Sequence, residues 1–264
     1  MICFDLDGTL LGPRGQIHPK DIRLLSDVSL APRLIPATGR PLESVRRTFA
    51  RNGLYIDEKL PFALVLQNGS LLYAANEARL AYYSFDPSVQ VELIQLARQF
   101  KHVMFLFLGT EDIHVLWPNS FGMKAAEKFE FTVQAFSTQS NKSQFSKIMC
   151  ISPFPNLLDR LAKPLKSLPV ESAFSMSTIL EITPKEVNKG SGLQKLLHML
   201  QQKTGTIYAA GDGENDLPMF QLARRSFAAD KASETVKRIA SQVINVCLNG
   251  LLEPILDSIA QDPS

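Results

Sequence analysis

Apolar and polar positions alternate along residues 1–80 in an order that predicts strand, helix, strand, helix and strand. Residues 1–4 are predicted to form a strand, residues 19–30 a helix, and the stretch that ends near Ala37 a second strand. A second helix follows, and two apolar strands then flank Asn68-Gly69, a hairpin-turn sequence. Strands separated by helices are typical of a parallel α/β sheet.

Residues 81–184 have a different pattern, in which strand-like apolar runs outnumber helices. Predicted helices cover residues 88–100 and 156–165, and predicted strands cover residues 103–108, 113–117, 146–152 and 178–183. This pattern favours a mostly antiparallel sheet in an α+β unit of small-domain size.

The alternation of strands and helices returns after residue 184. Leu193, Leu196, Leu197 and Leu200 form one apolar helical stripe, and a predicted strand ends at Asp212. A further helix is predicted from Asp216 to Ala223. We therefore expect an α/β protein with a Rossmann-like parallel sheet. Residues 1–80 and 185–264 would form this core, and residues 81–184 would form an inserted α+β domain.

The composition is that of an ordinary globular protein, with 45% hydrophobic and 20% charged residues. A formal net charge of +2 argues against binding to nucleic acid or to acidic membranes. The longest apolar runs are too short to span a bilayer, and Asp5 and Asp7 interrupt the position that a secretory signal would occupy. We expect a monomer or small homo-oligomer whose partner is a small molecule.

The three cysteines, Cys3, Cys150 and Cys247, have no spacing that suits a zinc site or a redox pair. Each lies in an apolar run, so we expect buried thiols. Such cysteine usage is typical of the reducing cytoplasm.

Carboxylates follow two of the strands predicted for the core. Asp5 and Asp7 come directly after the first strand, and Asp212 ends a later one, with Asp216 four residues further on. Ligands bind at the carboxyl ends of the strands in open parallel sheets, so these groups are expected to meet in one crevice. Because four carboxylates would repel one another, the sequence predicts a hard cation among them, and Mg²⁺ is the commonest where phosphate is also bound.

Other residues in the same positions suit a phosphate group. Thr38 and Gly39 supply a hydroxyl and an unobstructed amide just before a helix, and Lys189 supplies a mobile ammonium at the start of another. Alternatives stay open: Thr38 can be an ordinary helix cap. Lys189 can be a solvated residue, or Lys185 can take its role.

Several further residues have an ordinary structural explanation beside the functional one. Arg40 can contact substrate or lie exposed, Glu214 suits an exposed helix start, and Asn68 suits its turn. His114 and Trp117 lie in an apolar strand and are more often core residues than ligand contacts.

Four motifs, "DLDGTL", "ATGRP", the Lys of "VNKGSGL" and "GDGENDLPMF", resemble in order and spacing those of the haloacid dehalogenase-like (HAD) superfamily. The chain is most similar to the Cof-type phosphatases of that superfamily, which carry a type IIB cap between the second and third motifs. The insertion at residues 81–184 falls where that cap belongs, so the resemblance covers essentially the whole chain.

The resemblance implies a role for each motif residue. Asp5 would be the nucleophile that forms an aspartyl-phosphate, and Asp7 the general acid and then base. Mg²⁺ would be held by the Asp5 carboxylate, the Asp7 backbone carbonyl and Asp212, with Asp216 in or next to the same shell. The residues expected to contact the phosphoryl group or substrate are Thr38, Gly39, Arg40, Lys189 and Asn215.

We therefore expect a Mg²⁺-dependent phosphatase that hydrolyses small phosphomonoesters, sugar phosphates first, in the cytoplasm. The alternative is a phosphomutase, which uses the same aspartyl-phosphate chemistry on sugar phosphates but returns the phosphoryl group to the substrate. A non-catalytic protein that senses phosphate would need a broken motif, and all four motifs are intact.

Overall fold

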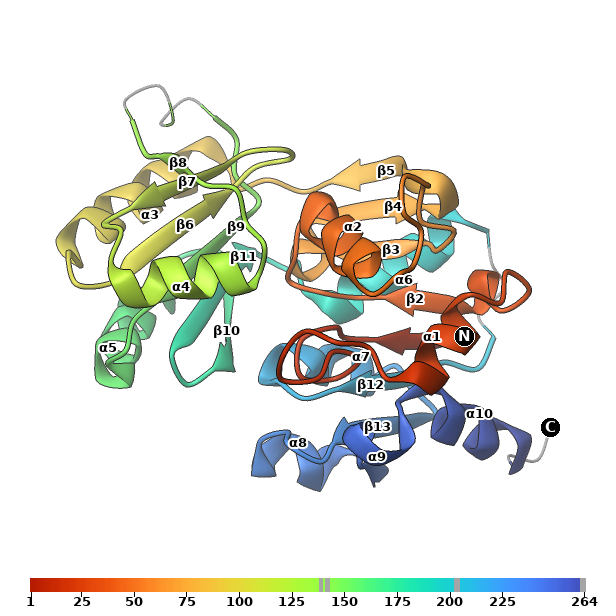
Figure 1. Ribbon diagram of the computed structural model, residues 1–264. Coiled ribbons are helices and arrows are strands. Elements are labelled where there is room, and N and C mark those ends of the chain that lie inside the picture. Colours follow the sequence, from red (N-terminus) through yellow and green to blue (C-terminus); the bar gives the residue numbers. More distant parts are fainter. Residues whose placement is uncertain (138–139, 141–142, 202–204, 262–264) are drawn as a thin grey trace.

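The computed structural model describes residues 1–137, 140, 143–201 and 205–261, and it places them around a parallel core sheet and a second, mostly antiparallel sheet (Figure 1). The expected α/β core with an inserted α+β cap is therefore confirmed. The boundaries at residues 80 and 185 remain a prediction. Among the described residues, no helix combines the length and the apolar character needed to cross a membrane.

The core sheet has five strands in the order β14-β13-β12-β1-β2, and every pair of neighbours is parallel. The first strand, β1, lies between β2 and β12, so both of its edges are hydrogen-bonded. The bounds are β1 Ile2–Phe4, β2 Leu34–Pro36, β12 Tyr208–Gly211, β13 Arg225–Ala229 and β14 Gln242–Ile244.

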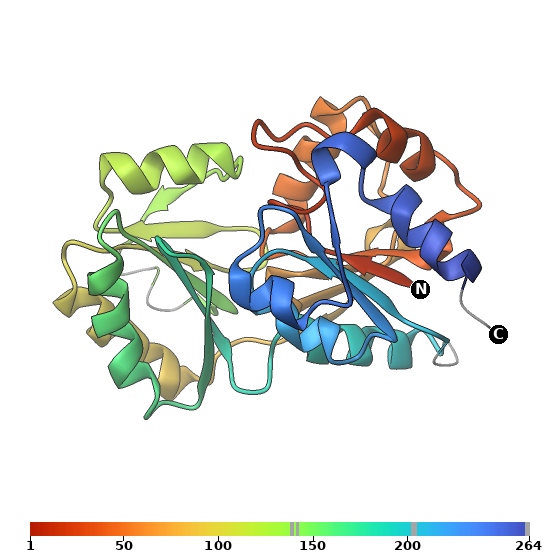
Figure 2. The same cartoon turned by 90° about the horizontal axis from the view of Figure 1, so that it is seen from below.

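Helices cover both faces of the core sheet (Figure 2). Ile2 and Phe4 point to one apolar cluster and Cys3 to the other, because successive strand residues face opposite sides. The first cluster includes residues of α1 Pro19–Leu25, α2 Leu42–Arg51 and α10 Leu252–Gln261. The second includes residues of α6 Lys189–Met199, α7 Leu217–Phe220 and α8 Glu234–Ile239. Each fully buried Leu, Ile or Phe contributes about 1.5–3 kcal/mol. Between β14 and α10 lies the single turn α9 Val246–Asn249.

A separate three-stranded antiparallel sheet adjoins β2 through one bridge between Ala37 and Val65. It consists of β3 Leu64–Leu66, β4 Leu71–Ala74 and β5 Ala78–Tyr82. The predicted hairpin around Asn68-Gly69 is confirmed, with Leu66 paired to Leu71. Asn68 and Gly69 both have positive φ, as their residue types allow.

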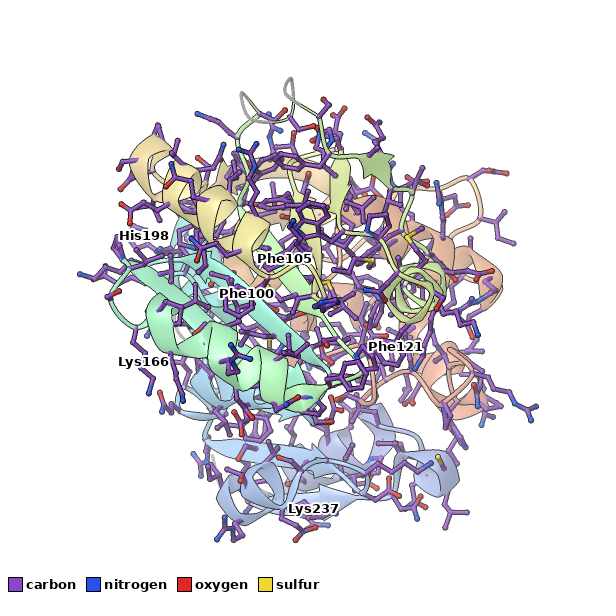
Figure 3. All side chains as sticks on the ribbon, turned by 90° about the vertical axis from the view of Figure 1, so that its left-hand side faces the viewer. Phe100, Phe105, Phe121, Lys166, His198 and Lys237 are labelled. Carbon is purple, nitrogen blue, oxygen red and sulfur yellow. The ribbon has the colours of Figure 1, made fainter. Side chains whose placement is uncertain are left out.

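The cap sheet has six strands in the order β10-β11-β9-β6-β7-β8. Helices α3 and α5 pack on one face around Phe105, and Phe100 joins the same layer (Figure 3). Helix α4 contributes Ala126 to the apolar cluster on the other face, which is the face that carries Met149. The helices are α3 Pro87–Gln99, α4 Ser120–Lys128 and α5 Pro155–Leu165. The strands are β6 Met104–Leu108, β7 Ile113–Leu116, β8 Gln134–Ala135, β9 Lys147–Ile151, β10 Val170–Met176 and β11 Ile179–Pro184.

Three expectations were wrong in detail. The first helix ends at Leu25 instead of residue 30, and Val28 is exposed. The helix expected from Asp216 is only α7, four residues long, preceded by a 3-10 turn. Cys247 is exposed rather than buried. It lies in α9, a helix of four residues, none of which is buried. Helix α4 and strand β10 were not predicted.

The Asp21 side chain connects helix α1 near the N-terminus to helix α10 near the C-terminus. Its buried carboxylate on α1 accepts the backbone N–H groups of Leu251 and Leu252, at 2.8–3.0 Å, where α10 begins. It thereby satisfies amides that a helix start leaves without partners. This side-chain cap fixes α10 against α1 beneath the sheet.

We predict that Asp21→Ala lowers the melting temperature without affecting the opposite end of the sheet. Two buried N–H groups would lose their acceptor, at a cost of about 1–3 kcal/mol, or about 2–4 °C for each kcal/mol in a domain of this size. Thermal unfolding followed by circular dichroism measures the change. Asp257→Ala, an exposed carboxylate on α10, is the matched control, and an equal effect of the two substitutions contradicts the capping role.

Candidate active site

The carboxyl ends of β1 and β12 bring Asp5 and Asp212 together. The two strands are parallel neighbours, with Phe4 paired to Ala210, so the residues that follow them lie side by side. One oxygen each of Asp5, Asp212 and Asp216 lies within 4.8 Å of the others. Three of the four aspartates expected in the site therefore form one cluster.

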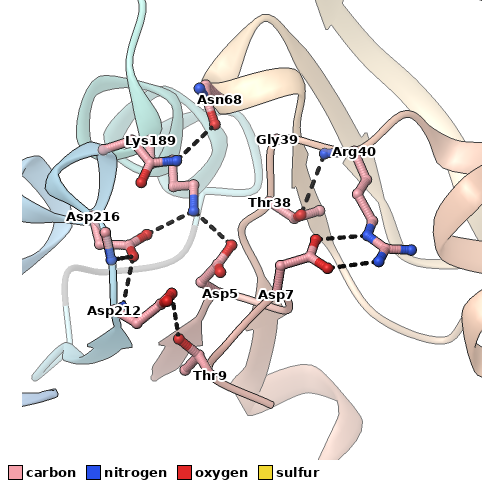
Figure 4. Close-up of polar contacts among 12 residues, drawn as sticks. Asp5, Asp7, Thr9, Thr38, Gly39, Arg40, Asn68, Lys189, Asp212 and Asp216 are labelled. Atoms are coloured by element: carbon pink, nitrogen blue, oxygen red, sulfur yellow. Dashed lines mark hydrogen bonds and ion pairs between the residues drawn. The ribbon is translucent and has the colours of Figure 1, made fainter. Parts of the chain in front are cut away.

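The Lys189 ammonium lies between two of these carboxylates (Figure 4). It donates to Oδ1 of Asp5 and to Oδ1 of Asp216, both at 2.6 Å, and the lysine is 1% exposed. Lys189 is the first residue of α6, and Asn188 caps that helix. The alternative of a solvated Lys189 is therefore wrong, and Lys185 is exposed, whereas Lys189 contacts Asp5.

Asp216 also organises the loop that carries Asp212. Its Oδ2 accepts the N–H groups of Asp212 and Gly213, at 2.9 and 3.0 Å. Both oxygens of Asp216 thus have hydrogen-bond donors, one ammonium and two amides. Its side chain is fully buried, so it fixes the position of Asp212 as well as that of Lys189.

Burial and mutual repulsion shift the titration of this cluster. Burial raises the pKa of Asp5 well above its ordinary value, and Asp216 and Asp212 add to that effect although Lys189 opposes it. Burial and the Asp216 carboxylate raise the pKa of Asp212 to about 7. Burial alone would lower the pKa of Lys189, but Asp216 and Asp5 outweigh it and hold that pKa above its usual range. The site thus has more negative charge than one ammonium compensates.

Asp7 points away from this cluster toward Arg40 (Figure 4). The guanidinium makes two parallel hydrogen bonds, from Nε to Oδ2 at 2.7 Å and from Nη2 to Oδ1 at 2.6 Å. Such a bidentate pair fixes the plane of the carboxylate. Arg40 is 3% exposed, so the alternative of an exposed arginine is wrong.

Thr38 and Gly39 lie between Asp7 and the cap. The Thr38 hydroxyl accepts the backbone N–H of Arg40 at 3.3 Å, and Gly39 lies so close to the cap that a Cβ atom would come within 2.4 Å of Lys147 Nζ. Gly8 is similarly constrained, with φ +81° and no room for a Cβ beside Asp212. At Gly8 the positive φ favours glycine, whereas at Gly39 a Cβ would require the Lys147 ammonium, the end of a flexible side chain, to shift.

The cap contributes a buried ion pair that the sequence reasoning missed. Lys147 on β9 donates to Glu181 on β11 at 2.8 Å, and both side chains are at most 5% exposed. Lys147 also donates to the carbonyl of Gly39 at 2.8 Å. Burial opposes ionisation of Glu181, but the Lys147 ammonium and the Asn68 amide outweigh it and lower the pKa of Glu181.

Two asparagines of the core complete the contacts of Glu181. Asn68 donates to Glu181 Oε2 at 2.5 Å, and Asn215 donates to the same oxygen at 3.3 Å. The sequence suggested only a turn role for Asn68, whereas in the structure Asn68 also donates a hydrogen bond to Glu181. The hydrogen bond from Asn68 to a cap residue 113 positions away is seen only in the structure.

A small cavity of about 40 Å³ lies between these groups. Its core side carries the expected residues and its cap side is largely apolar. The lining residues are Asp5, Asp7, Thr38, Gly39, Arg40, Asp212 and Asn215 from the core, and Phe129, Phe131, Met149, Ser175, Met176 and Glu181 from the cap. Every residue expected at the site lies in this lining or contacts it. Glu214 is exposed. His114 is a buried residue bonded to Asp112 and Ser140, as a structural histidine would be.

Comparison with known proteins agrees with this architecture. A phosphoglycolate phosphatase of Methanopyrus kandleri is 26% identical over 93% of this chain and 90% of its own. A solved protein of Thermotoga maritima is 26% identical, with a TM-score of 0.78 over 99% of this chain and 97% of its own. A solved sugar phosphatase described as HAD subclass IIB shares the fold at 19% identity, with a TM-score of 0.80 over 97% of this chain and 98% of its own.

The family model of the haloacid dehalogenase-like hydrolases matches residues 2–249, which include the core sheet, the cap and all four motifs. The resemblance seen in those motifs is thereby confirmed. The chain belongs to the haloacid dehalogenase-like hydrolases.

Proposed function

We propose that this hydrolase is a Mg²⁺-dependent phosphatase that cleaves small phosphomonoesters through an aspartyl-phosphate on Asp5. The observation that carries the proposal is the juxtaposition of Lys189, the three clustered aspartates and the Arg40-bound Asp7 around one cavity between core and cap. One Lys, several carboxylates and a cation are the parts needed to neutralise a transferring phosphoryl group.

Asp5 would attack phosphorus with the carboxylate oxygen that Lys189 leaves free. Lys189 contacts Oδ1, so Oδ2 forms the new O–P bond while the bond between phosphorus and the leaving oxygen breaks. Water then attacks phosphorus in the second step and releases phosphate and the original carboxylate. Two easier displacements replace one difficult hydrolysis.

Asp7 would protonate the leaving oxygen in the first step and take a proton from water in the second. Both of its oxygens are hydrogen-bonded to Arg40, which keeps the carboxylate in one plane. Arg40 therefore holds the Asp7 carboxylate and also lines the cavity. We propose that it positions Asp7 and contacts the substrate.

The donor set fits a Mg²⁺ ion. Thr9 uses Oδ1 of Asp212, so the hydrogen bonds of the described residues leave Oδ2 of Asp212 for a cation. Because Oδ2 of Asp5 is the nucleophile, Asp5 would offer the cation the second lone pair of Oδ1, the oxygen that also accepts from Lys189. One ammonium faces three carboxylates at this site, so a further cation would offset the remaining negative charge. Oxygen ligands suit Mg²⁺. We assign Asp5, Asp212 and the Asp7 carbonyl as ligands, with Asp216 holding them in place; the ion would offset phosphoryl charge.

The remaining residues would hold the substrate. Thr38, Gly39 and Lys189 would bind the phosphoryl oxygens, and Asn215 would contact the group beyond them. The cap side offers apolar surface from Phe129, Phe131 and Met149 together with the Glu181 carboxylate. A sugar phosphate presents both apolar C–H faces and hydroxyls, so it is the substrate class that we propose first. The cytoplasm is the proposed compartment, because the cysteines are free thiols.

We predict phosphate release that requires Mg²⁺ and Asp5. The assay would use sugar phosphates, nucleotides and a chromogenic ester, with Mg²⁺ or with chelator. Asp5→Asn should lower kcat/KM by at least about 1,000-fold because the nucleophile is lost. Glu214→Gln, an exposed carboxylate in the same loop as Asp212, should retain full activity. Isomerised sugar phosphate without free phosphate would point to the mutase, and full activity of Asp5→Asn would contradict both.

We also predict that Mg²⁺ stabilises the protein more as pH rises. The folded pKa of Asp212 is about 7, above its ordinary value of 3.8. The metal-free protein therefore loses stability as pH rises through this interval. Mg²⁺ binds the deprotonated form. Melting temperatures with and without saturating Mg²⁺ should differ by at least about 4 °C more at about pH 8 than at about pH 5. An equal Mg²⁺ effect at both values would count against this site.

A further inference from the structure

Arg40, which holds Asp7, is itself held by two hydroxyls of the core. Its Nη1 donates to Ser44 Oγ at 3.1 Å and to Thr48 Oγ1 at 2.6 Å. Both hydroxyls belong to α2, one turn apart, and both residues are at most 1% exposed. The guanidinium therefore has Asp7 on one side and the face of α2 on the other.

Each of these hydroxyls also donates a hydrogen bond to the cap. Ser44 Oγ donates to the backbone carbonyl of Phe129 at 2.5 Å, and Thr48 Oγ1 donates to Glu130 Oε2 at 3.2 Å. Each hydroxyl thus accepts from Arg40 and donates to the segment that follows α4. Hydrogen bonds in such a chain polarise one another, so the cap acceptors strengthen the hydrogen bonds that the two hydroxyls accept from Arg40.

The backbone at Phe129 and Glu130 brings both residues into contact with the hydroxyls of α2. Glu130 has φ +60°, a conformation that non-glycine residues rarely adopt. The other oxygen of its carboxylate pairs with Arg51 Nη1 at 2.5 Å. Just before it, the Phe129 ring lies 5.5 Å from the Arg40 guanidinium, within the range of a cation–π contact. A strained backbone is retained where the side chain has a specific contact to make.

These contacts cannot stay closed throughout a catalytic cycle. The cavity of about 40 Å³ is much smaller than the roughly 300–1,000 Å³ of typical small-molecule sites, so the closed arrangement does not accommodate a sugar phosphate. Substrate entry therefore requires the cap to move away from the core. When it does, Ser44 and Thr48 lose their cap acceptors, and Arg40 keeps Asp7 and the two hydroxyls but loses the Phe129 ring.

We propose that the cap positions Asp7 through this chain: Glu130 and the Phe129 carbonyl fix the hydroxyls of Thr48 and Ser44, which fix Arg40 and thereby the Asp7 carboxylate. The acid–base group is then correctly oriented only when the cap is closed over the substrate. Thr48 and Glu130 are positioning residues in this arrangement. The inference rests on the proposed role of Asp7 as acid and base.

The experiment compares two phosphate esters that differ in their need for an acid. An alkyl phosphate needs a proton on its leaving oxygen, whereas 4-nitrophenolate leaves as a stable anion. We expect Thr48→Val and Glu130→Ala to lower kcat/KM by at least about tenfold for the alkyl ester and by less than about threefold for 4-nitrophenyl phosphate. Thr48→Ser, which restores the hydroxyl, should recover most of the loss.

Glu127→Ala is the matched control, because Glu127 is an exposed carboxylate on α4, the helix that Glu130 follows, and it should behave as wild type on both esters. Melting temperatures show whether each variant is folded. An equal loss on both esters would mean that the chain only holds the cap shut, and would overturn the proposal, as would no loss at all.

Asp7→Asn separates this inference from the proposed function. It should show the same selectivity as the positioning variants, with a larger loss on the alkyl ester. If Asp7→Asn is selective and Thr48→Val and Glu130→Ala are not, the relay from the cap is wrong and the role of Asp7 stands. If Asp7→Asn loses activity equally on both esters, the acid role of Asp7 is wrong and the relay falls with it.

Discussion

The buried ammonium of Lys189 is the contact on which the whole site depends. It bridges Asp5 at the end of β1 and Asp216 after β12, two carboxylates from opposite ends of the chain. Without it, the three clustered carboxylates would repel one another in a place where burial already disfavours their charge. With it, one ammonium still faces three carboxylates, and the proposed Mg²⁺ site is argued from this charge balance.

Polar contacts join the cap to the core on two sides of this site. On one side, the Lys147–Glu181 pair of the cap meets Gly39, Asn68 and Asn215 of the core. On the other side, Phe129 and Glu130 meet the hydroxyls of α2. Buried ion pairs and hydroxyls add little net stability but are demanding in geometry. Such contacts suit a cap that must open and then return to one closed position.

The sequence predicted the part of the site that follows from strand order. Asp5, Thr38 and Asp212 end parallel strands, and such ends meet at one edge, so their proximity needs no tertiary information. The cap residues could not be found in this way. Lys147 begins β9 and Glu181 lies within β11. The register pairs Glu181 with Met149, two residues from Lys147, so both side chains lie on one face of the cap sheet, and this is seen only in the structure.

The bidentate Asp7–Arg40 pair was also out of reach of the sequence, because the ATGRP pattern allows an exposed or a buried arginine equally. Helix α1 is shorter than its apolar positions suggested, since Ser26 bonds back to Ile22 and ends it. Cys247 showed that an apolar run does not guarantee burial in a single helical turn. Local sequence patterns thus predicted most helices and strands, whereas the contacts of individual side chains depend on how those elements pack.

The most direct test of the account is to trap the phosphoryl group on the enzyme. Protein mixed with a substrate and Mg²⁺ would be quenched and treated with borohydride, which reduces an acyl phosphate to an alcohol. The account predicts homoserine in place of Asp5 in the N-terminal peptide, dependent on substrate, as the mark of a phosphoryl group carried by that carboxylate. An unmodified Asp5 under conditions of rapid turnover, or homoserine at another aspartate, would contradict it.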